Sequence, residues 1–574
     1  MHLNLIKSLI SDAVQAAGFE LNEEEIRLDQ TKTLEHGHFS TNVAMILAGK
    51  LKQAPRQVAE GIVNYLESEW IKKAEIAGPG FINLWIEQKF YTDEAASILK
   101  NLDAMLKDAF EASSQKTLVM DYSHPNIAKP MGVHHLLSTI IGDSIKKIYQ
   151  RYGWKVVADN FIGDMGTQFG KLMYAIKEWG VMEAIEKDPI RELQKLYVRF
   201  HQEAEDSAQQ EALEDAGRLE YLKFEQGEPE ARKLWEKIRA WSLQEIQPIY
   251  DRLGVEFDVV HGESFYEDKM QPILEEGIEE GVIVEGEGGA LIIPSDDPEG
   301  TPALLKKSDG ATLYATRDLA RIKYWEETWH PQLMMVVVDQ AQSFHFEQVF
   351  FAAQKLKLTE ARNVHVDFGR MQFKDGKMST RKGNIILLTE VLDEAEERAK
   401  ALVAEKGMDL SEEEAEILAK DMGINSIKYN ILSQNRTTNI TFDWDKMLSF
   451  EGNSAPYLMY TIARAKSILR KAEVTTEACQ KFTFAPELDV EMQLMIQLLM
   501  YPDAIRRAAE DFKPNHIANY LYQLASDFNS FYNGNSILKA DETLRNSRLL
   551  MTAAVIRVME DGFGLLGMRS LERM

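Results

Sequence analysis

The sequence predicts an α/β protein: a central domain built on a parallel sheet and carrying helical insertions, an α+β module before it, and an all-α domain after it. Two short apolar stretches, Thr117–Tyr122 and Trp154–Asp159, predict strands, and His135–Gln150 between them has helical spacing. A strand, a helix and a second strand in this order form a βαβ unit, whose two strands lie parallel. The parallel sheet is therefore the framework for the rest of the chain.

The N-terminal module is predicted to span residues 1–110. Helical spacing over Ile10–Ala17 and Val43–Leu51 predicts two helices, and Pro55 is a favourable first residue for a third. The stretch Ile76–Trp85 alternates like a strand and contains a Gly-Pro-Gly turn signal. Helices combined with a strand and a tight turn indicate a small α+β unit.

The central domain is predicted to span residues 111–430, and an all-helical domain to span 431–574. Within the central domain, residues 171–300 form mostly long, charged, amphipathic segments, which predict a helical insertion. The apolar runs Leu333–Val338 and Val364–Phe368 predict two further strands of the parallel sheet.

Composition excludes several classes of protein. The chain has 574 residues, of which 45% are hydrophobic and 27% charged, as in globular proteins with a large core. The longest purely apolar runs have six residues, far fewer than the roughly 20 that span a bilayer. No secretory signal is apparent, so we expect a cytoplasmic protein with no membrane partner. Because Cys479 is the only cysteine, a disulfide framework and a Cys-rich zinc site are excluded, and we expect no protein-bound metal.

The net charge of −26 seems to argue against a nucleic-acid partner, because phosphate binding depends on Lys and Arg. However, residues 201–300 carry a net charge of −19 and residues 391–420 a net charge of −6, so the rest of the chain is nearly neutral. Acidic blocks of this kind are most simply solvated helix faces. The total charge therefore does not exclude RNA.

One segment contains candidate functional residues. It spans residues 121–138 and reads Asp-Tyr-Ser-His-Pro-Asn-Ile-Ala-Lys-Pro-Met-Gly-Val-His-His-Leu-Leu-Ser. Ligands of parallel sheets bind beyond the carboxyl ends of the strands, and a helix beginning near His135 directs free N–H groups at a phosphate there. Lys129 and the imidazoles of His134 and His135 add donors. The alternative interpretation is an ordinary βα loop with a solvated lysine.

A second segment, residues 376–384, reads Gly-Lys-Met-Ser-Thr-Arg-Lys-Gly-Asn. From Arg370 to Lys382 there are five basic residues and one acidic residue. Glycines near both ends allow a loop to move, and its cations could close over a polyphosphate leaving group. Alone, this pattern is equally typical of a basic surface loop.

Together the two segments resemble the HIGH and KMSKS signatures of class I aminoacyl-tRNA synthetases, and their surroundings resemble arginyl-tRNA synthetase in particular. Similar segments in the same order are residues 78–83, 124–131, 138–143, 160–170, 314–318, 377–383 and 565–574. The resemblance implies a Rossmann-type catalytic domain, an N-terminal domain that recognises the tRNA D-loop, and a C-terminal anticodon-binding domain. It implies that L-arginine reacts with ATP, supplied with Mg²⁺, and is then esterified to tRNA(Arg), with release of pyrophosphate and AMP. We expect a monomer.

Matching motifs carry four sets of site residues over to this chain. The resemblance assigns catalysis to Lys129, His134, His135, Lys377 and Lys382; arginine binding to Asp121, Asn126, Tyr314, Asp318 and Gln342; ATP binding to Gly132, His135, Gly163, Asp164, Gln168, Met378 and Ser379; and tRNA binding to Phe81, Asn83, Tyr457, Tyr460 and Arg464.

Elementary chemistry agrees with the arginine set. A guanidinium has five donors and no acceptor, so its pocket must supply carboxylates and amide oxygens, and the ammonium of lysine cannot satisfy the same planar pair of acceptors. For Asp318 the alternative is a helix-capping role, and for Asn83 it is a turn-capping role. Aromatic residues beside a cation, such as Tyr460 and Arg464, suit stacking on unpaired bases, although buried core tyrosines explain the pattern equally well.

The sequence departs from the family where its signature has His-Val-Gly-His-Leu-Arg-Ser after Lys-Pro-Met, because here the residues are Gly-Val-His-His-Leu-Leu-Ser. Gly132 has no side chain for the ATP phosphates, and His134 places an imidazole where adenosine would lie on the backbone. Losing one transition-state donor reduces a rate by about 10²–10³. A rearranged loop in which His134 supplies the missing imidazole would compensate. The alternative function is therefore a catalytically impaired or silent paralogue that binds tRNA or a protein.

Overall fold

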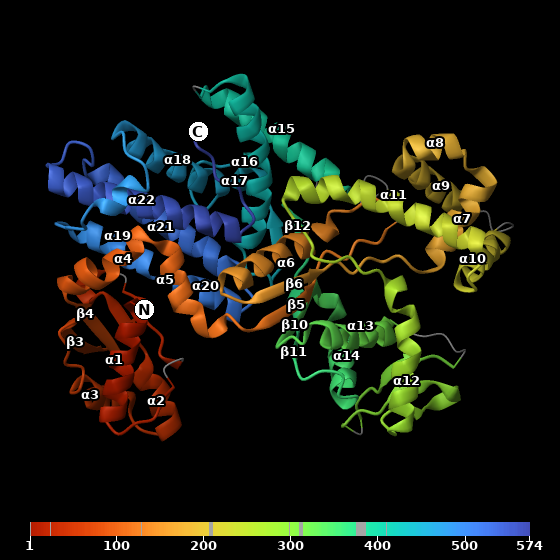
Figure 1. Ribbon diagram of the computed structural model, residues 1–574, viewed down its shortest axis with the longest axis horizontal. Helices are drawn as coiled ribbons and strands as arrows, with labels where there is room; N and C mark the ends of the chain where they lie inside the picture. Colours follow the sequence, from red (N-terminus) through yellow and green to blue (C-terminus); the bar gives the residue numbers. More distant parts are fainter. Residues whose placement is uncertain are drawn as a thin grey trace.

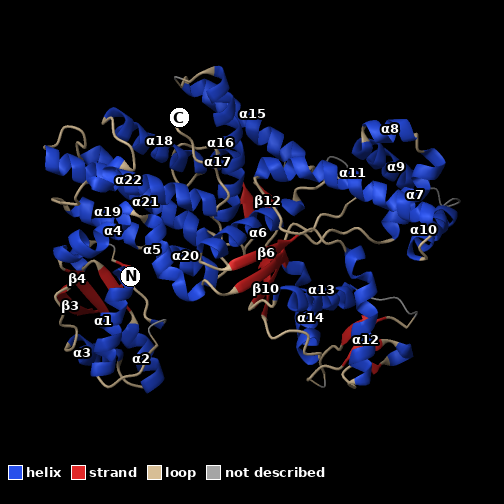
Figure 2. Cartoon of the chain, viewed as in Figure 1, coloured by secondary structure: helices blue, strands red, loops and turns tan. Residues whose placement is uncertain are grey.

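The computed structural model describes residues 2–22, 25–31, 33–127, 129–205, 210–297, 299–308, 314–374, 386–408 and 410–574. The chain forms an elongated molecule with the N-terminal module and the C-terminal helices at one end, the parallel sheet in the middle, and the helical insertion at the other end (Figure 1). The strands gather in the N-terminal module, in the middle and beside α12 (Met270–Glu279), as Figure 2 shows.

The N-terminal module packs helices against an antiparallel sheet. Its elements are α1 (His2–Ala16), β1 (Asp29–Gln30), β2 (Phe39–Thr41), α2 (Val43–Leu51), α3 (Pro55–Val63), β3 (Ile71–Ala77) and β4 (Phe81–Ile86). The strand order is β1-β2-β4-β3. The predicted strand with an internal turn is confirmed as the hairpin of β3 and β4, in which Gly78 and Gly80 both have positive φ. At Gly80 a Cβ would lie 2.8 Å from Cβ of Pro55, so the turn requires glycine there.

The central sheet is fully parallel. Its elements, with the helices beside them, are β5 (Thr117–Asp121), α6 (His134–Arg151), β6 (Lys155–Asp159), α13 (Tyr314–Trp329), β10 (Leu333–Asp339), α14 (Ser343–Lys355) and β11 (Arg362–Phe368). The strand order is β11-β10-β5-β6, which confirms the predicted βαβ unit and the two later strands. The chain leaves β5 toward one edge and later returns to the other, so the strand order switches between β5 and β10. Ligands of such sheets bind at this switch point.

The insertion contains the predicted charged helices and, in addition, a small antiparallel sheet. Its helices are α7 (Thr167–Trp179), α8 (Met182–Lys187), α9 (Pro189–Glu203), α10 (Gln210–Glu225) and α11 (Pro229–Leu253). Three strands follow α12 in the sequence: β7 (Val284–Glu285), β8 (Leu291–Ile293) and β9 (Ala303–Lys306). The sequence analysis did not predict these strands, because segments of two to four residues are too short to show an alternating pattern.

The C-terminal part is helical apart from one short strand. Its elements are α15 (Leu388–Lys406), α16 (Glu412–Leu432), β13 (Ile440–Phe442), α17 (Trp444–Met447), α18 (Ala455–Lys471), α19 (Asp489–Leu499), α20 (Tyr501–Glu510), α21 (Asn515–Gly534) and α22 (Glu542–Leu565). Strand β13 pairs in parallel with β12 (Met371–Phe373), so the prediction of an entirely helical C-terminal segment is wrong at these three residues. The helices α4 (Ala96–Lys100) and α5 (Leu102–Phe110) connect the N-terminal module to β5.

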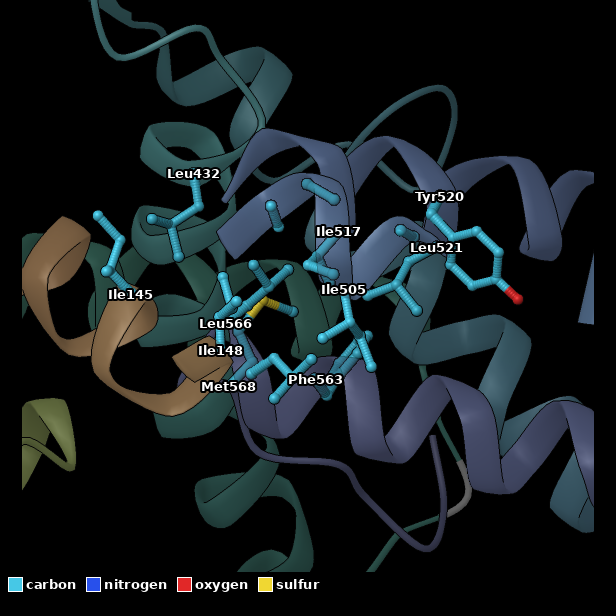
Figure 3. Close-up of a cluster of buried hydrophobic side chains, with 14 of the residues drawn as sticks. Ile145, Ile148, Leu432, Ile505, Ile517, Tyr520, Leu521, Phe563, Leu566 and Met568 are labelled. Atoms are coloured by element: carbon cyan, nitrogen blue, oxygen red, sulfur yellow. The ribbon is translucent and has the colours of Figure 1, made fainter. Parts of the chain in front are cut away.

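Helix α6 joins the sheet to the C-terminal helices. One face packs below β5 and β10, where Ser138 Oγ donates to the carbonyl of Val337 at 2.6 Å. The opposite face enters a hydrophobic cluster with the C-terminal helices (Figure 3), whose labelled members are Ile145, Ile148, Leu432, Ile505, Ile517, Tyr520, Leu521, Phe563, Leu566 and Met568. Ser144 Oγ also donates to the carbonyl of Leu565 at 2.8 Å. The first turn of α6 is thus held rigidly at the switch point.

Gly142 allows α6 to pass close to β5, and its replacement tests that packing. A Cβ at Gly142 would lie 2.3 Å from Cβ of Tyr122, so we expect Gly142→Ala to lower the free energy of unfolding by about 1–3 kcal/mol through overpacking. In the matched control Gly49→Ala, on an exposed part of α2 with no atom within 4 Å, stability should rise by up to about 1 kcal/mol because alanine favours helix. Urea unfolding of the two variants measures both effects, and equal stability would contradict the proposed contact.

Candidate active site

A cavity of about 680 Å³ lies at the carboxyl ends of the central strands. Its walls come from the segments that follow β5, β6 and β10, and from α13 and α14. Six of the predicted site residues line it together: Asn126, Gly163, Gln168, Tyr314, Asp318 and Gln342. These residues are far apart in the sequence, and the parallel sheet brings them to one place because its strands end at the same edge.

At the cavity, the backbone of the loop after β5 lies close to that of the loop after β6. Asn126 and Gly163 form an isolated parallel bridge, and Ile127 N–H donates to the carbonyl of Gly163 at 3.2 Å. A Cβ at Gly163 would lie 2.3 Å from Oδ1 of Asn126. Glycine is therefore required at this position so that the loops after β5 and β6 can lie side by side.

The two carboxylates predicted to bind arginine are held by an arginine of the chain itself. The guanidinium of Arg321 donates to Asp121 and, at 2.8 Å, to Oδ1 of Asp318. Asp121 is fully buried and also accepts from Phe161 N–H at 3.2 Å. The guanidinium carbon of Arg321 lies 4.5 Å from the centroid of the Phe161 ring and 5.1 Å from that of Trp325. The sequence analysis missed Arg321, although its position three residues after Asp318 on a helix was a usable signal.

Two histidines surround this ion pair. His345 Nε2 lies 2.7 Å from Oδ2 of Asp318. Burial by itself would raise the pKa of Asp318, but Arg321 and His345 hold it below its usual value. His124 Nε2 lies 3.2 Å from Oδ2 of Asp121 without forming a hydrogen bond, and burial together with the charge of Arg321 lowers the pKa of His124 to about 3. His124 is therefore neutral at pH 7.

Glu263 and Arg317 form a second ion pair at the cavity, which the sequence analysis also missed. Arg317 Nη1 lies 3.3 Å from Oε1 of Glu263, and Glu263 lines the cavity. Burial raises the pKa of Glu263 to about 7 in spite of Arg317. A carboxyl group with this pKa changes its charge near neutral pH.

The residues predicted to contact ATP phosphates lie beside the cavity. The first turn of α6 has no side-chain cap, and His135 N–H donates to the carbonyl of Gly132 at 3.0 Å and Leu136 N–H to that of Val133 at 3.1 Å, so what this terminus offers an anion is mainly the positive end of the helix dipole. His134 is exposed and its ring centroid lies 4.0 Å from that of His135, which is buried with Nδ1 3.2 Å from the carbonyl of Gly132. Burial lowers the pKa of the His135 imidazole to about 4. Lys129 Nζ lies 4.9 Å from the ring centroid of Tyr197 on α9.

The predicted residues Lys377, Met378, Ser379 and Lys382 lie outside the described residues, and the chain is described again from Ile386. Val133 N–H donates to the carbonyl of Ile386 at 2.9 Å, and Leu388 N–H donates to the carbonyl of Met131 at 2.8 Å. The described residues 386–388 are therefore hydrogen-bonded to the segment that begins α6.

Asp164, which was predicted to bind ATP, has its side chain hydrogen-bonded within the protein. Its buried carboxylate accepts from Ser264 N–H at 2.9 Å and from Ser264 Oγ at 2.8 Å, and Arg239 Nε lies 3.3 Å away. A Cβ at Gly262 would lie 1.9 Å from its Oδ2. In the described structure Asp164 fastens the loop after β6 to the segment before α12, and its side chain faces the protein interior.

The residues predicted to contact tRNA lie on two surfaces. Phe81 and Asn83 share the more exposed face of β4, together with Trp85, over which Lys73 Nζ lies 4.5 Å from the ring centroid. Burial patterns place the other residues of β4 inside the module. This face therefore presents aromatic and polar groups to solvent.

The second surface is a cavity of about 850 Å³ between α18, the end of α21 and the C-terminal residues. Arg464 is placed by Asn529, whose Oδ1 accepts at 2.7 Å, and its guanidinium carbon lies 4.7 Å from the ring of Tyr460 and 5.1 Å from that of Tyr532. Tyr457 lies behind them, with its hydroxyl accepting from Asn529 Nδ2 at 3.1 Å. The cationic side chains that line the cavity are Arg464, Arg470, Lys471, Lys539 and Arg573, and no Asp or Glu side chain is among the described lining residues.

Comparison with known proteins agrees with this architecture. The model of tRNA synthetases class I (R), catalytic domain, matches residues 97–444, the DALR anticodon binding domain matches 458–574, and the arginyl tRNA synthetase N-terminal domain matches 4–86. A parallel sheet of this order, with a cavity at its switch point and a helical C-terminal domain, is the architecture of class I synthetases, and the predicted fold class is confirmed.

Individual relatives define the family within this class. The arginine–tRNA ligase of Fusobacterium nucleatum is 41% identical over 94% of this chain and 93% of its own, and that of an Exiguobacterium strain is 40% identical over 96% and 97%. Arginyl-tRNA synthetase of Thermus thermophilus shares the fold with a TM-score of 0.83 over 100% of both chains, at 23% identity. The chain belongs to the arginyl-tRNA synthetase family of class I aminoacyl-tRNA synthetases.

Within the described residues, no group of three or more His, Cys, Asp or Glu side chains is arranged to hold a metal ion. None of the helices in the described ranges has both the length and the hydropathy needed to cross a membrane.

The raised pKa of Glu263 predicts a pH dependence of stability. A carboxyl group ionises near pH 4.5 when unfolded but near pH 7 here, so the folded state binds the proton more tightly and loses stability as the pH rises from about 4.5 to 7. A shift of this size corresponds to at most about 3 kcal/mol. Glu263→Gln does not titrate, so its melting temperature should fall less between pH 5 and pH 8 than that of the wild type. Glu60→Gln, at an exposed position of α3, should keep the wild-type difference.

Proposed function

We propose that this chain is an arginine–tRNA ligase, which activates L-arginine with ATP and esterifies it to tRNA(Arg), releasing pyrophosphate and AMP. The observation that carries the proposal is the shared cavity, where Asn126, Tyr314, Asp318 and Gln342 meet in a chain of this family. Carboxylate and amide oxygens at one end of a cavity suit a guanidinium. Gly163, Gly166 and the first residues of α7 line the same cavity, and glycines before an uncapped helix N-terminus suit a nucleotide phosphate.

In the proposed reaction the carboxylate of arginine attacks the α-phosphorus of ATP, and pyrophosphate leaves. The positive end of the α6 dipole, with Lys129, His134 and His135, assists the phosphates, and Lys377 and Lys382 stabilise the leaving pyrophosphate. His135 is neutral at pH 7 and its Nδ1–H is directed at the carbonyl of Gly132, so in this arrangement its Nε2 is an acceptor and His134 is the imidazole that can donate to a phosphate. Mg²⁺ enters as part of the ATP complex. The ribose hydroxyl at the tRNA end then attacks the adenylate, and AMP leaves.

The tRNA is proposed to bind along the side of the molecule formed by the N-terminal module and the C-terminal helices. The domains assigned are 1–110 for the D-loop, 111–430 for catalysis and 431–574 for the anticodon. The insertion, which contains most of the acidic block 201–300, lies at the opposite end of the molecule (Figure 1). This charge separation steers a polyanion toward the basic cavity. We propose that the chain acts as a cytoplasmic monomer.

A second candidate function is a silent paralogue that binds tRNA(Arg) or a protein without catalysis. Two observations favour it. By the resemblance, Gly132 and His134 stand where the family signature has the residues that serve the ATP phosphates and adenosine. In addition, Arg321 already holds both carboxylates of the arginine pocket.

Arginine-dependent ATP–pyrophosphate exchange separates the two functions. The purified protein is assayed with and without tRNA(Arg), because the family generally requires tRNA for this step. Exchange that depends on L-arginine in either condition supports the ligase. Absence of exchange in both, combined with tight binding of tRNA(Arg), would reject the ligase in favour of the silent paralogue.

Restoring the family signature tests the altered motif. If Gly132 leaves the phosphates without a donor, the double variant Gly132→His, His134→Gly should exchange pyrophosphate faster by about 10²–10³. The comparison is made at saturating ATP and L-arginine. A slower double variant would show that His134 already supplies the imidazole from its own position.

Exposed Tyr460 offers a test of the basic cavity as a tRNA site. Removing a stacking ring reduces nucleic-acid affinity by about 1–3 kcal/mol, so Tyr460→Ala should bind tRNA(Arg) roughly tenfold or more weakly in a filter-binding assay. Leu219→Ala, an exposed apolar position on α10 in the acidic insertion, is the control and should bind normally. Unchanged affinity in Tyr460→Ala would place the tRNA elsewhere.

A further inference from the structure

The guanidinium of Arg321 lies at the cavity, and the proposed function does not explain its position. Arg321 is almost completely buried, and its two terminal nitrogens each donate to a different carboxylate, Asp121 and Asp318. The planar guanidinium lies over the ring of Phe161. A bound arginine side chain would need the same acceptors in the same plane.

We propose that Arg321 occupies the guanidinium subsite of the amino-acid pocket, so that it is an internal competitor of free L-arginine and sets the affinity of the site. This inference rests on the proposed function, because that function makes Asp121 and Asp318 the arginine pocket. Arg321 is then a specificity-determining residue. It excludes a second guanidinium until its own side chain moves away.

The charges around the pocket support exclusion over simultaneous binding. Asp121 and Asp318 are paired with Arg321, and nearby Asp159 is occupied by hydrogen bonds from Trp325 and Tyr266. The imidazoles of His124 and His345 add no negative charge. The nearby carboxyl group of Glu263 is paired with Arg317. A second guanidinium placed beside Arg321 would therefore be a like charge in a largely buried site, with no free carboxylate of its own.

The hydrogen bonding of Arg321 is also incomplete. Its Nε is buried and has no partner, whereas buried donors in proteins are nearly always satisfied. The side chain also forms part of the cavity wall, so a cavity of about 680 Å³ lies in front of it. A guanidinium with an unsatisfied donor at the edge of an open cavity is easier to displace than one enclosed in a fully bonded network.

Occupation by Arg321 has a measurable consequence for affinity. When a site is free for only a fraction of the time, the apparent dissociation constant is the intrinsic constant divided by that fraction. If Arg321 is bound at least about ten times as often as it is displaced, its removal strengthens arginine binding about tenfold or more. A purely structural ion pair predicts the reverse, because its loss would distort the pocket.

The test is calorimetric titration of L-arginine into the full-length wild type, Arg321→Ala and a matched control, Arg548→Ala. Arg548 is a buried arginine of α22 paired with Glu491 at 2.6 Å, remote from the cavity. We expect Arg321→Ala to bind L-arginine at least about tenfold more tightly than the wild type, and Arg548→Ala to bind it as the wild type does. Equal or weaker binding by Arg321→Ala overturns the inference.

If Arg321→Ala does not fold, a second variant tests the same inference. Arg321→Lys keeps one cation but cannot bridge both carboxylates, and it should bind L-arginine more tightly than the wild type. Melting curves add an independent readout: L-arginine should raise the melting temperature of Arg321→Ala more than ethylguanidinium does, because only L-arginine also has the α-amino and carboxylate groups. An equal effect of the two compounds would indicate simple filling of a cavity and would contradict the inference.

The inference and the proposed function can fail separately. If the wild type charges tRNA(Arg) with arginine but Arg321→Ala binds L-arginine no more tightly, the function stands and the inference is overturned. If the wild type charges no tRNA but Arg321→Ala gains affinity, the inference stands and the ligase function fails in the native chain. Absence of arginine binding by every variant overturns the inference.

Discussion

The burial of α6 between the parallel sheet and the C-terminal helices is the constraint on which the rest of the molecule depends. The helix follows β5 directly, so its first turn must lie at the switch point of the sheet. Its body contacts Tyr122 through Gly142 on one side and the cluster of Figure 3 on the other. A helix packed on both faces in this way keeps its N-terminus in one position relative to the sheet.

Buried acidic groups at the cavity have partners within the chain, whereas the cations of the C-terminal surface are differently placed. At the cavity, buried acidic groups are paired with cations of the chain, Arg321 with Asp121 and Asp318, and Arg317 with Glu263. At the C-terminal surface, the cations of the basic cavity have no carboxylate side chain among the described lining residues. A buried charge must be paired because desolvation is unfavourable, whereas an unpaired surface charge is solvated by water and remains available to a ligand. The first arrangement favours a defined pocket, and the second favours a polyanion.

Much of the site was predicted by carrying family motif residues over to this chain, and the parallel sheet explains why they meet. Asn126, Gly163 and Gln342 come after β5, β6 and β10, and parallel strands bring such residues to one edge. Asp164 lies within the same motif but turns inward to Ser264, because contacts with a segment 100 residues away decide its direction. Arg321 was overlooked for a related reason, since an arginine on an amphipathic helix normally faces solvent.

By itself, the sequence determined the class of fold, the order of the domains and the chemical character of the two motifs, because periodicity and turn residues are local properties of the chain. It also determined the family, through several long segments in the right order. Only the tertiary structure decided which charges meet. The distance between Arg321 and Asp121 depends on how α13 packs beside β5, and 200 residues separate the two in the chain. Pairing across such a separation is set by packing in three dimensions and leaves no local pattern.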